Sequence, residues 1–439
     1  MFKIKLTFLI LLISIFITFS VPSFAKSDET YSTLRMMVDI MEIIDSKYVE
    51  EKKPNDLALG AIKGVVKSLD PYSQFMDEKD YKEMKTETQG SYGGIGLRIT
   101  TQDDELTVLT PIPDTPAYFS GILPEDKITK IDDKSTMDMS TDEAVKLMRG
   151  NPGTTVVLTI YRAATKEELT FTIKRKKIKI ETVKKKMLEN NIGYIRLSEF
   201  NAQSAADMEK MLKELSKDGM TSLILDLRNN PGGLLDSAVD ICSLFIKENS
   251  IVVSTRGRDK MIEQNYYTQK VPLYPDLPMA ILINRGSASA SEIVTGTMQD
   301  YKRATVVGSN SFGKGSVQTI IPLSGGNALR LTIAKYYLPS GRNITHSDNK
   351  KDKTNGITPD VYVEVSPETE VKLYMQAESD KLPKKNKNKS KEKNKDKTED
   401  GNISGVEIVK DGDKDTKNAE DETVKDEVLE TAVNLLKGK

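Results

Sequence analysis

Three short segments of the chain carry residue types that acyl-transfer chemistry needs. The first, Asn284–Glu292, follows an apolar run and holds three serines at the start of an expected helix, whose free N–H groups stabilise an alkoxide or oxyanion. The second, Gly313–Gln318, places Lys314 between two glycines. A dry pocket disfavours charged lysine, so a neutral amine there can accept a serine proton. A serine–lysine pair needs no histidine, and the chain has only one, His346.

The third segment, Asp226–Gly233, ends an expected strand and opens another helix. Its glycine N–H groups, alongside the N–H of Ala290, are suited to hold an oxyanion. Each of the three segments also has a structural interpretation. Small serines and alanines pack well at a helix start, and both Gly-Lys-Gly and Asn-Pro-Gly-Gly are good turn sequences. Taken singly, the segments leave both interpretations open.

The elements that must position these segments alternate between strand and helix over residues 178–370. Apolar runs predict the strands, and periodic runs between them predict the helices. This alternation indicates an α/β core with a partly parallel sheet. The expected strands are Ile192–Leu197, Ser222–Leu227, Ile251–Ser254 and Met279–Ile283, the expected helices are Ala202–Leu215, Leu234–Ile246 and Ser289–Tyr301, and hairpin-like strands follow at Val317–Ile321 and Ala328–Tyr337.

Residues 84–175 have the pattern of a small β-rich domain with one helix, Thr141–Arg149, preceded by a Ser140–Glu143 capping box. The N–H groups of a glycine-rich loop can trap a carboxylate, while the following strand and the helix hold an extended peptide. This order of features resembles a PDZ domain, and an unrelated small β domain is the alternative. The expected strands are Ile95–Thr100, Leu106–Thr110, Lys127–Ile131, Thr155–Tyr161 and Leu169–Arg175. The expected peptide-binding residues are Gly93, Gly94, Ile95, Gly96 and Leu97.

Both ends of the chain differ in composition from the middle. Residues 1–25 have the pattern of a signal peptide or an uncleaved N-terminal anchor, with a buried core helix as the structural alternative. Residues 29–83 predict a helical region. Residues 380–420 are rich in lysine, which predicts a disordered linker or a basic tether to wall polymer or membrane. Residues 421–438 predict an amphipathic helix that needs a partner surface.

Composition excludes several classes of function. The 439 residues include 64 Lys and Arg against 65 Asp and Glu, so a net charge of −1 gives no general attraction to nucleic acid or anionic lipid. With one cysteine and one histidine, the chain cannot form an intrachain disulfide, a zinc finger or a Cys/His metal cluster. We expect no metal and no cofactor. We expect Cys242 to be a small core residue and His346 to lie in a surface loop.

Together, the three segments and the inserted PDZ-like stretch resemble the carboxyl-terminal processing peptidases, or tail-specific proteases, over about residues 30–370. That family of serine peptidases uses a serine–lysine pair. By position, the resemblance implies that Ser289 is the nucleophile, Lys314 the general base and Gln318 the residue that orients the lysine. If Lys314 and Gln318 lie on one face of a strand, their side chains point the same way. The resemblance also implies that Gly233 and Ala290 are the oxyanion-hole donors.

Two assignments have neighbouring or structural alternatives. Ser287 and Ser291 are the other candidates for the nucleophile. Arg149, at the end of the PDZ-like helix, resembles an arginine that couples the PDZ domain to the protease core in some members of the family. A cation at that place also complements the dipole of the helix.

The resemblance implies a protease core similar to the crotonase-like fold, with an inserted PDZ domain and N-terminal helices. It implies a serine endopeptidase that acts on proteins with exposed C-terminal tails, with the PDZ domain binding the tail and promoting activity. The N-terminal segment, the single cysteine and a composition rich in lysine and asparagine suggest a bacterium, so we expect the protease to act outside the cytoplasmic membrane, either secreted or anchored to it. The expected partners are such substrates and a second copy in a homodimer, with no nucleic acid and no membrane contact except through the N-terminal segment. A catalytically silent PDZ adaptor or chaperone and an acyl-CoA-handling enzyme of crotonase-like fold are the alternatives.

Overall fold

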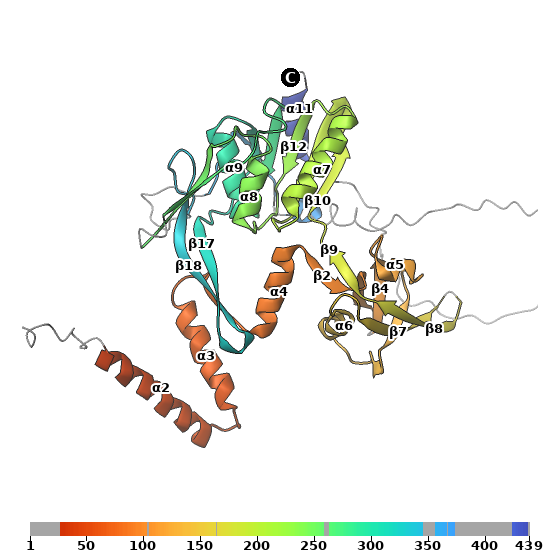
Figure 1. Ribbon diagram of the computed structural model, residues 1–439, viewed down its shortest axis with the longest axis vertical. Coiled ribbons are helices and arrows are strands. Elements are labelled where there is room, and N and C mark those ends of the chain that lie inside the picture. The colour runs from red at the N-terminus through yellow and green to blue at the C-terminus, as the bar shows by residue number, and fades with distance from the viewer. Residues whose placement is uncertain are drawn as a thin grey trace, which may run out of the picture. The chain divides into compact units, whose positions relative to one another are not determined.

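The computed structural model describes residues 27–102, 105–163, 165–258, 263–345, 356–366, 368–373 and 424–437 (Figure 1). The expected signal peptide or anchor, the lysine-rich linker and His346 lie outside these residues. The chain forms two compact units, of which the smaller comprises residues up to Glu78 together with Gln318–Thr332, and the larger comprises the rest. Within the described ranges, no helix is both long and apolar enough to span a membrane.

A six-stranded sheet forms the centre of the larger unit, with the strand order β10-β11-β12-β15-β16-β19. Its strands are β10 (Val183–Met187), β11 (Ile192–Leu197), β12 (Ser222–Asp226), β15 (Met279–Ile283), β16 (Thr305–Gly308) and β19 (Val361–Tyr362). β10 pairs antiparallel with β11, and all other neighbours pair parallel. The carboxyl ends of the five parallel strands therefore meet at one edge of the sheet.

Both faces of this sheet are covered, which explains the continuous apolar runs of β12 and β15. Helices α7 (Ser204–Lys217), α8 (Leu235–Cys242) and α9 (Ala290–Asp300) pack on one face, with strand residues such as Leu225 and Ile281. Alternate strand residues, including Ile224 and Leu282, point to the other face, where the C-terminal helix α11 (Glu427–Leu436) packs. The amphipathic pattern near the C-terminus thus has its partner surface on the sheet (Figure 1).

A second sheet flanks this core. In the larger unit, β13 (Ile251–Gly257) pairs antiparallel with β14 (Gln264–Tyr267) and with the C-terminal part of β18 (Ala328–Tyr337). The expected hairpin is present, because β17 (Ser316–Pro322) pairs with β18.

The smaller unit holds α2 (Ser27–Lys47), α3 (Pro54–Lys67) and β1 (Gln74–Met76), which pairs antiparallel with the start of β18. Residues 29–83 are therefore mostly helical, as the sequence predicts, but they include one short strand. The turn after α3 is held by Asp70, whose carboxylate accepts hydrogen bonds from the Ser73 hydroxyl (2.7 Å) and the Thr332 hydroxyl (3.2 Å).

The PDZ-like stretch lies within the larger unit and has its own apolar core. Its sheet contains β3 (Leu97–Gln102), β4 (Glu105–Pro111), β5 (Lys127–Ile131), β6 (Lys134–Ser135), β7 (Thr155–Arg162) and β8 (Glu167–Lys174), and its helices are α5 (Pro116–Phe119) and α6 (Thr141–Met148). The predicted capping box is confirmed, because Glu143 N donates to Ser140 Oγ (3.3 Å) and Ser140 N donates to a Glu143 carboxylate oxygen (3.0 Å).

The segment through which the chain enters the PDZ-like stretch has a different secondary structure from the one that the sequence predicts. α4 (Glu78–Gln89) leads into β2 (Ser91–Gly94), which pairs antiparallel with β9 (Lys176–Lys179) where the chain leaves the stretch. Gly93 and Gly94 are therefore strand residues rather than part of an open loop. Packing explains why residue 93 is a glycine, because a Cβ on Gly93 would lie 2.1 Å from the carbonyl oxygen of Gly150.

Candidate active site

Ser289 occupies the turn between β15 and α9. Its backbone has φ +55° and ψ −114°, a region that costs a non-glycine residue of order 1–3 kcal/mol. The two neighbouring serines have structural roles, because the Ser287 hydroxyl donates to Leu227 O (2.8 Å) and the Ser291 hydroxyl donates to Asn230 O (2.9 Å). The hydroxyls of the other two serines thus tie the turn to the loop after β12, and Ser289 occupies the strained position itself.

Glu292, which our sequence reasoning did not single out, connects the serine turn to the lysine segment. Its side chain is fully buried in the first turn of α9. Oε2 accepts hydrogen bonds from the backbone N–H groups of Ser289 (2.8 Å) and Lys314 (2.9 Å). Oε1 accepts from the Ser311 hydroxyl (2.5 Å) and from Gly313 N (2.6 Å). One carboxylate therefore fixes the backbones of both expected catalytic residues.

The pKa of Glu292 is raised by its burial, although the four hydrogen bonds act in the opposite direction. All four partners are donors, so the carboxylate must be ionised to accept them together. In the sequence, Glu292 stands three residues after Ser289, the spacing of an ordinary helix cap. That pattern was the available signal, but it does not reveal that donors from a second segment converge on the same side chain.

The lysine segment is held from two further sides. Phe312 N donates to Ser287 O (3.0 Å), and Tyr336 N, on β18, donates to Gly315 O (2.8 Å). A Cβ on Gly315 would lie 2.5 Å from the Thr345 hydroxyl, so only glycine fits there without displacement. Burial raises the pKa of the Tyr336 phenol to about 12, although a hydrogen bond with the Ser289 side chain acts to lower this pKa. Tyr336 is a second residue at this site that sequence reasoning missed.

The loop after β12, residues 227–233, lies directly against the serine turn. A Cβ on Gly232 would be 2.7 Å from Ala288 O, 2.8 Å from Ser289 Cβ and 2.9 Å from Ala290 N. Gly232 N donates to Asn230 Oδ1 (2.9 Å), whereas among the described residues the N–H groups of Gly233 and Ala290 have no hydrogen-bond acceptor. The structure thus brings the glycine pair and the start of α9 together.

Two asparagines join this loop to the serine turn. Asn229 N donates to Asn284 Oδ1 (2.9 Å), and Asn284 Nδ2 donates back to Asn229 Oδ1 (2.9 Å). Ala288 N also donates to Asn230 O (3.0 Å). A shift of the loop after β12 must therefore move the serine turn as well.

Gln318 lies on β17, and its Nε2 donates to Thr332 Oγ1 (3.4 Å) within the smaller unit. β17 begins at Ser316, so Lys314 precedes the strand. The condition that both side chains share a strand face is therefore not met. The orienting role of Gln318 stays a prediction.

The expected peptide-binding residues lie in and just after β2. Ile95 is a buried core residue, and Gly96 O accepts hydrogen bonds from Ile112 N (2.9 Å) and the Thr115 hydroxyl (3.1 Å). Only Ile95 and Gly96 separate β2 from β3, which starts at Leu97. The glycine-rich loop is accordingly shorter than the sequence suggested.

Arg149 is the C-cap residue of α6, and its guanidinium carbon lies 4.8 Å from the centre of the Tyr92 ring. Arg149 is exposed, and Tyr92 belongs to β2. The contact joins the end of the helix to the strand through which the chain enters the PDZ-like stretch. Coupling to the protease core through Arg149 stays a prediction.

Comparison with known proteins decides the family. Residues 191–363 match the model of peptidase family S41, residues 93–174 match a PDZ domain, and residues 20–80 match the activating protease CtpB N-terminal domain. The carboxy-terminal-processing protease of Bartonella bacilliformis is 42% identical over 77% of this chain and 77% of its own. This chain belongs to the carboxy-terminal-processing proteases. It is a serine-type peptidase with a PDZ domain, as the sequence predicts.

A probable CtpA-like serine protease of Staphylococcus haemolyticus is 39% identical to this chain. The alignment covers 69% of this chain and 60% of that relative's length. The solved photosystem II D1 C-terminal processing protease aligns with 75% of this chain and 92% of its own, at 27% identity and a TM-score of 0.41.

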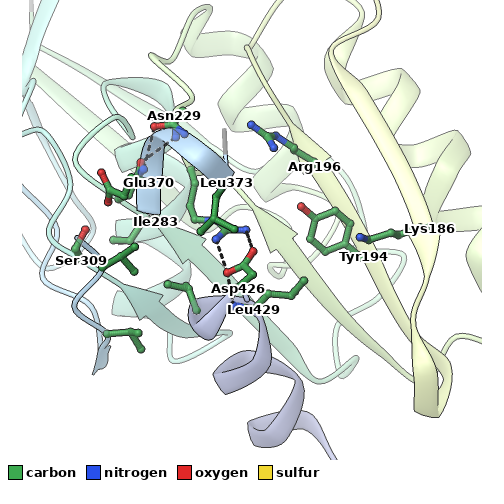
Figure 2. A pocket seen from close by; sticks show the side chains of 15 residues that line it. Lys186, Tyr194, Arg196, Asn229, Ile283, Ser309, Glu370, Leu373, Asp426 and Leu429 are labelled. Atoms are coloured by element: carbon green, nitrogen blue, oxygen red, sulfur yellow. Dashed lines mark hydrogen bonds and ion pairs between the residues drawn. The ribbon is translucent and has the colours of Figure 1, made fainter. Parts of the chain in front are cut away.

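A cavity of about 150 Å³ lies beside the loop after β12, at the carboxyl ends of the parallel strands (Figure 2). Arg196 from β11 and the Asn229–Asn284 pair line it, and so do Asp426 and Leu429 from the C-terminal helix. Away from this cavity, Cys242 is fully buried in the core, as predicted, and burial raises the pKa of its thiol.

Proposed function

We propose that the protease is a serine endopeptidase in which Ser289 is the nucleophile and Lys314 the general base. The observation that carries this proposal is the buried Glu292 carboxylate, whose Oε2 accepts hydrogen bonds from both backbone N–H groups. The two nitrogen atoms are therefore no further apart than those two hydrogen bonds allow. An ordinary helix cap does not need donors from a second segment, whereas a two-residue catalytic pair needs its two backbones held close to each other.

In the proposed reaction, the neutral Lys314 amine takes the proton of the Ser289 hydroxyl as its oxygen attacks the scissile carbonyl. The tetrahedral intermediate then loses the amine half of the substrate, which takes the proton from Lys314. Water, activated by the same amine, hydrolyses the acyl-enzyme and restores Ser289. Gln318 orients Lys314 in this scheme.

The N–H groups of Gly233 and Ala290 hold the oxyanion. The close approach of Gly232 to the serine turn supports this role, because it sets the neighbouring glycine beside the first N–H group of α9. The positive end of that helix adds to the stabilisation of the developing charge.

The substrates are proteins with exposed C-terminal tails. A PDZ groove recognises a free carboxylate and adds an extended peptide to a strand, so the PDZ domain binds the tail and promotes activity, with Arg149 coupling it to the core. The N-terminal segment places the protease outside the cytoplasmic membrane of a bacterium. The similarity of the core to the crotonase-like fold also stays a prediction from the sequence.

The protease also forms a homodimer through its N-terminal helices. α2 exposes Tyr31, Met36 and Ile43, each with more than half of its surface accessible. Exposed apolar area of this extent on one helix favours a protein partner. Sedimentation equilibrium of the protease and of a Met36→Lys, Ile43→Lys variant tests this, and a monomeric parent contradicts it.

Cleavage of an unstructured protein with an apolar C-terminus tests the catalytic assignment. We expect the parent to generate fragments visible by mass spectrometry, Ser289→Ala to generate none, and Ser291→Ala to retain turnover because its hydroxyl has only the structural bond to Asn230. Lys314→Ala should remove acylation while keeping the fold. Cleavage by Ser289→Ala contradicts the proposal, and a folded parent that binds C-terminal peptides without cleaving supports the silent adaptor instead.

A further inference from the structure

Arg228, at the start of the loop after β12, lies between two carboxylates that are distant in sequence. Its Nε and Nη2 donate to Asp226 Oδ1 (3.0 Å) and Oδ2 (2.7 Å). Its Nη1 and Nη2 also donate to Asp426 Oδ1 and Oδ2, both at 2.9 Å. The second pair is a two-pronged contact between residues 198 positions apart.

Asp426 is held in place by the helix that it begins. It is the N-cap of α11, and its Oδ1 accepts a hydrogen bond from Leu429 N (3.0 Å). Val428, Ala432 and Leu436 of the same helix are buried against the sheet. Figure 2 shows Asp426 and Leu429 at the start of this helix, and its dashed lines include the hydrogen bonds that the Asp426 carboxylate accepts from the Arg228 guanidinium. The apolar face of α11 thus fixes the Asp426 carboxylate.

Arg228 has little freedom once both carboxylates bind it. Asp226 is fully buried, and it also accepts hydrogen bonds from Arg228 N (2.9 Å) and the Tyr194 hydroxyl (2.7 Å). The side chain of Arg228 is only 13% exposed. Removing the Asp426 carboxylate leaves the outer edge of the guanidinium facing the 150 Å³ cavity that both residues line. Such a partly buried cation with one of its two carboxylates removed is left with less charge compensation, which destabilises its position.

We propose that Asp426 is a positioning residue for catalysis: by fixing Arg228 it holds the loop that carries Gly233, so the C-terminal helix is part of the catalytic scaffold. The inference rests on the proposed role of Gly233 as an oxyanion donor. Its connection to the serine turn is physical, because Asn229 and Asn230, which follow Arg228 directly, are hydrogen-bonded to Asn284 and Ala288.

Substitutions at Asp426 separate this role from helix capping. Serine and asparagine are as good at the N-cap as aspartate, so Asp426→Ser and Asp426→Asn keep the cap and remove the carboxylate. Glu430→Gln is the matched control, because it removes a carboxylate from the same helix whose partner is the exposed Lys425 (2.9 Å). Kinetics of peptide cleavage, phosphonylation of Ser289 by a fluorophosphonate with loss of fluoride, and urea unfolding are measured on each full-length chain.

We expect Asp426→Ser and Asp426→Asn to lower kcat and the phosphonylation rate about tenfold, with KM within about twofold and the chain fully folded in the assay. Glu430→Gln should match the parent in all readouts. An unchanged kcat and an unchanged phosphonylation rate in the two Asp426 variants overturn the inference, and so does a loss of activity that only follows the unfolded fraction. An inactive parent instead contradicts the proposed function itself.

Discussion

Ser289 and Lys314 share one hydrogen-bond acceptor, Oε2 of Glu292, at 2.8 and 2.9 Å. The proposed catalytic pair is therefore linked through its backbone by a buried carboxylate, independently of where the two side chains point. The other carboxylate oxygen accepts from Ser311 and Gly313, so the same group also shapes the segment before the lysine. Disturbing Glu292 should consequently affect both residues together.

Glu292→Gln should reduce kcat/KM by about 100-fold or more, because displacing reacting groups by about 1 Å is enough for such a loss. The amide nitrogen cannot accept, so at least two of the four donors lose their acceptor at a cost of about 1–3 kcal/mol each. Peptide-cleavage kinetics and urea unfolding measure the two effects. Wild-type kcat/KM in a folded Glu292→Gln protein would show that the shared acceptor is not needed.

Protonation of Glu292 at low pH should lower the activity of the protease without lowering its free energy of unfolding. Burial raises its folded-state pKa above the ordinary value of 4.5, so the stability that this group contributes is full at low pH and is lost as the pH rises through the raised pKa. Only the ionised form can accept all four hydrogen bonds. We therefore expect the reactivity of the Ser289 hydroxyl to fall on acidification through the raised pKa of Glu292, although protonation of Glu292 does not itself destabilise the fold.

The measurement for this pH effect is fluorophosphonate labelling of Ser289 across the acidic range, with circular dichroism as the check of folding. Glu292→Gln is the control, because it cannot titrate and its residual rate should lack the acidic loss due to this carboxyl. An identical acidic limb in parent and variant would assign the loss to another group.

Gly232→Ala should abolish acylation. Gly232 has φ +101°, and a Cβ there would lie 2.8 Å from Ser289 Cβ and 2.9 Å from Ala290 N. Gly219→Ala is a matched control, because Gly219 has φ +90° and no atom within 4 Å of its Cβ position. Both variants carry backbone strain of about 1–2 kcal/mol, but only the new Cβ of Gly232→Ala collides with the serine turn. Equal acylation rates in the two folded variants would contradict the close approach.

Ser140→Ala should destabilise the PDZ helix by about 1 kcal/mol, because the Ser140 hydroxyl caps Glu143 N. Hydrogen exchange of α6 amides measures the local effect. Ser140→Thr keeps the cap and should behave like the parent. Equal protection in Ser140→Ala and the parent would show that the cap contributes nothing measurable.

Local sequence determined much of the secondary structure. Ile192–Leu197 and Met279–Ile283 were predicted with their observed bounds, because short apolar strands buried on both faces leave an uninterrupted pattern. The capped helix after Ser140 followed from residues three positions apart. By contrast, β9 and β10 are lysine-rich and were not predicted, because pairing with β2 and β11, not apolar character, makes them strands.

The sequence by itself also determined the serine, lysine and glycine segments and the amphipathic pattern of the C-terminal helix, since each is a short-range pattern. Only the tertiary structure decided that Glu292 accepts donors from segments about 20 residues apart in the chain. Only it placed α11 on the sheet and Asp426 on Arg228. Such contacts depend on which surfaces the whole chain buries together, and no local spacing encodes a pair of residues 198 positions apart.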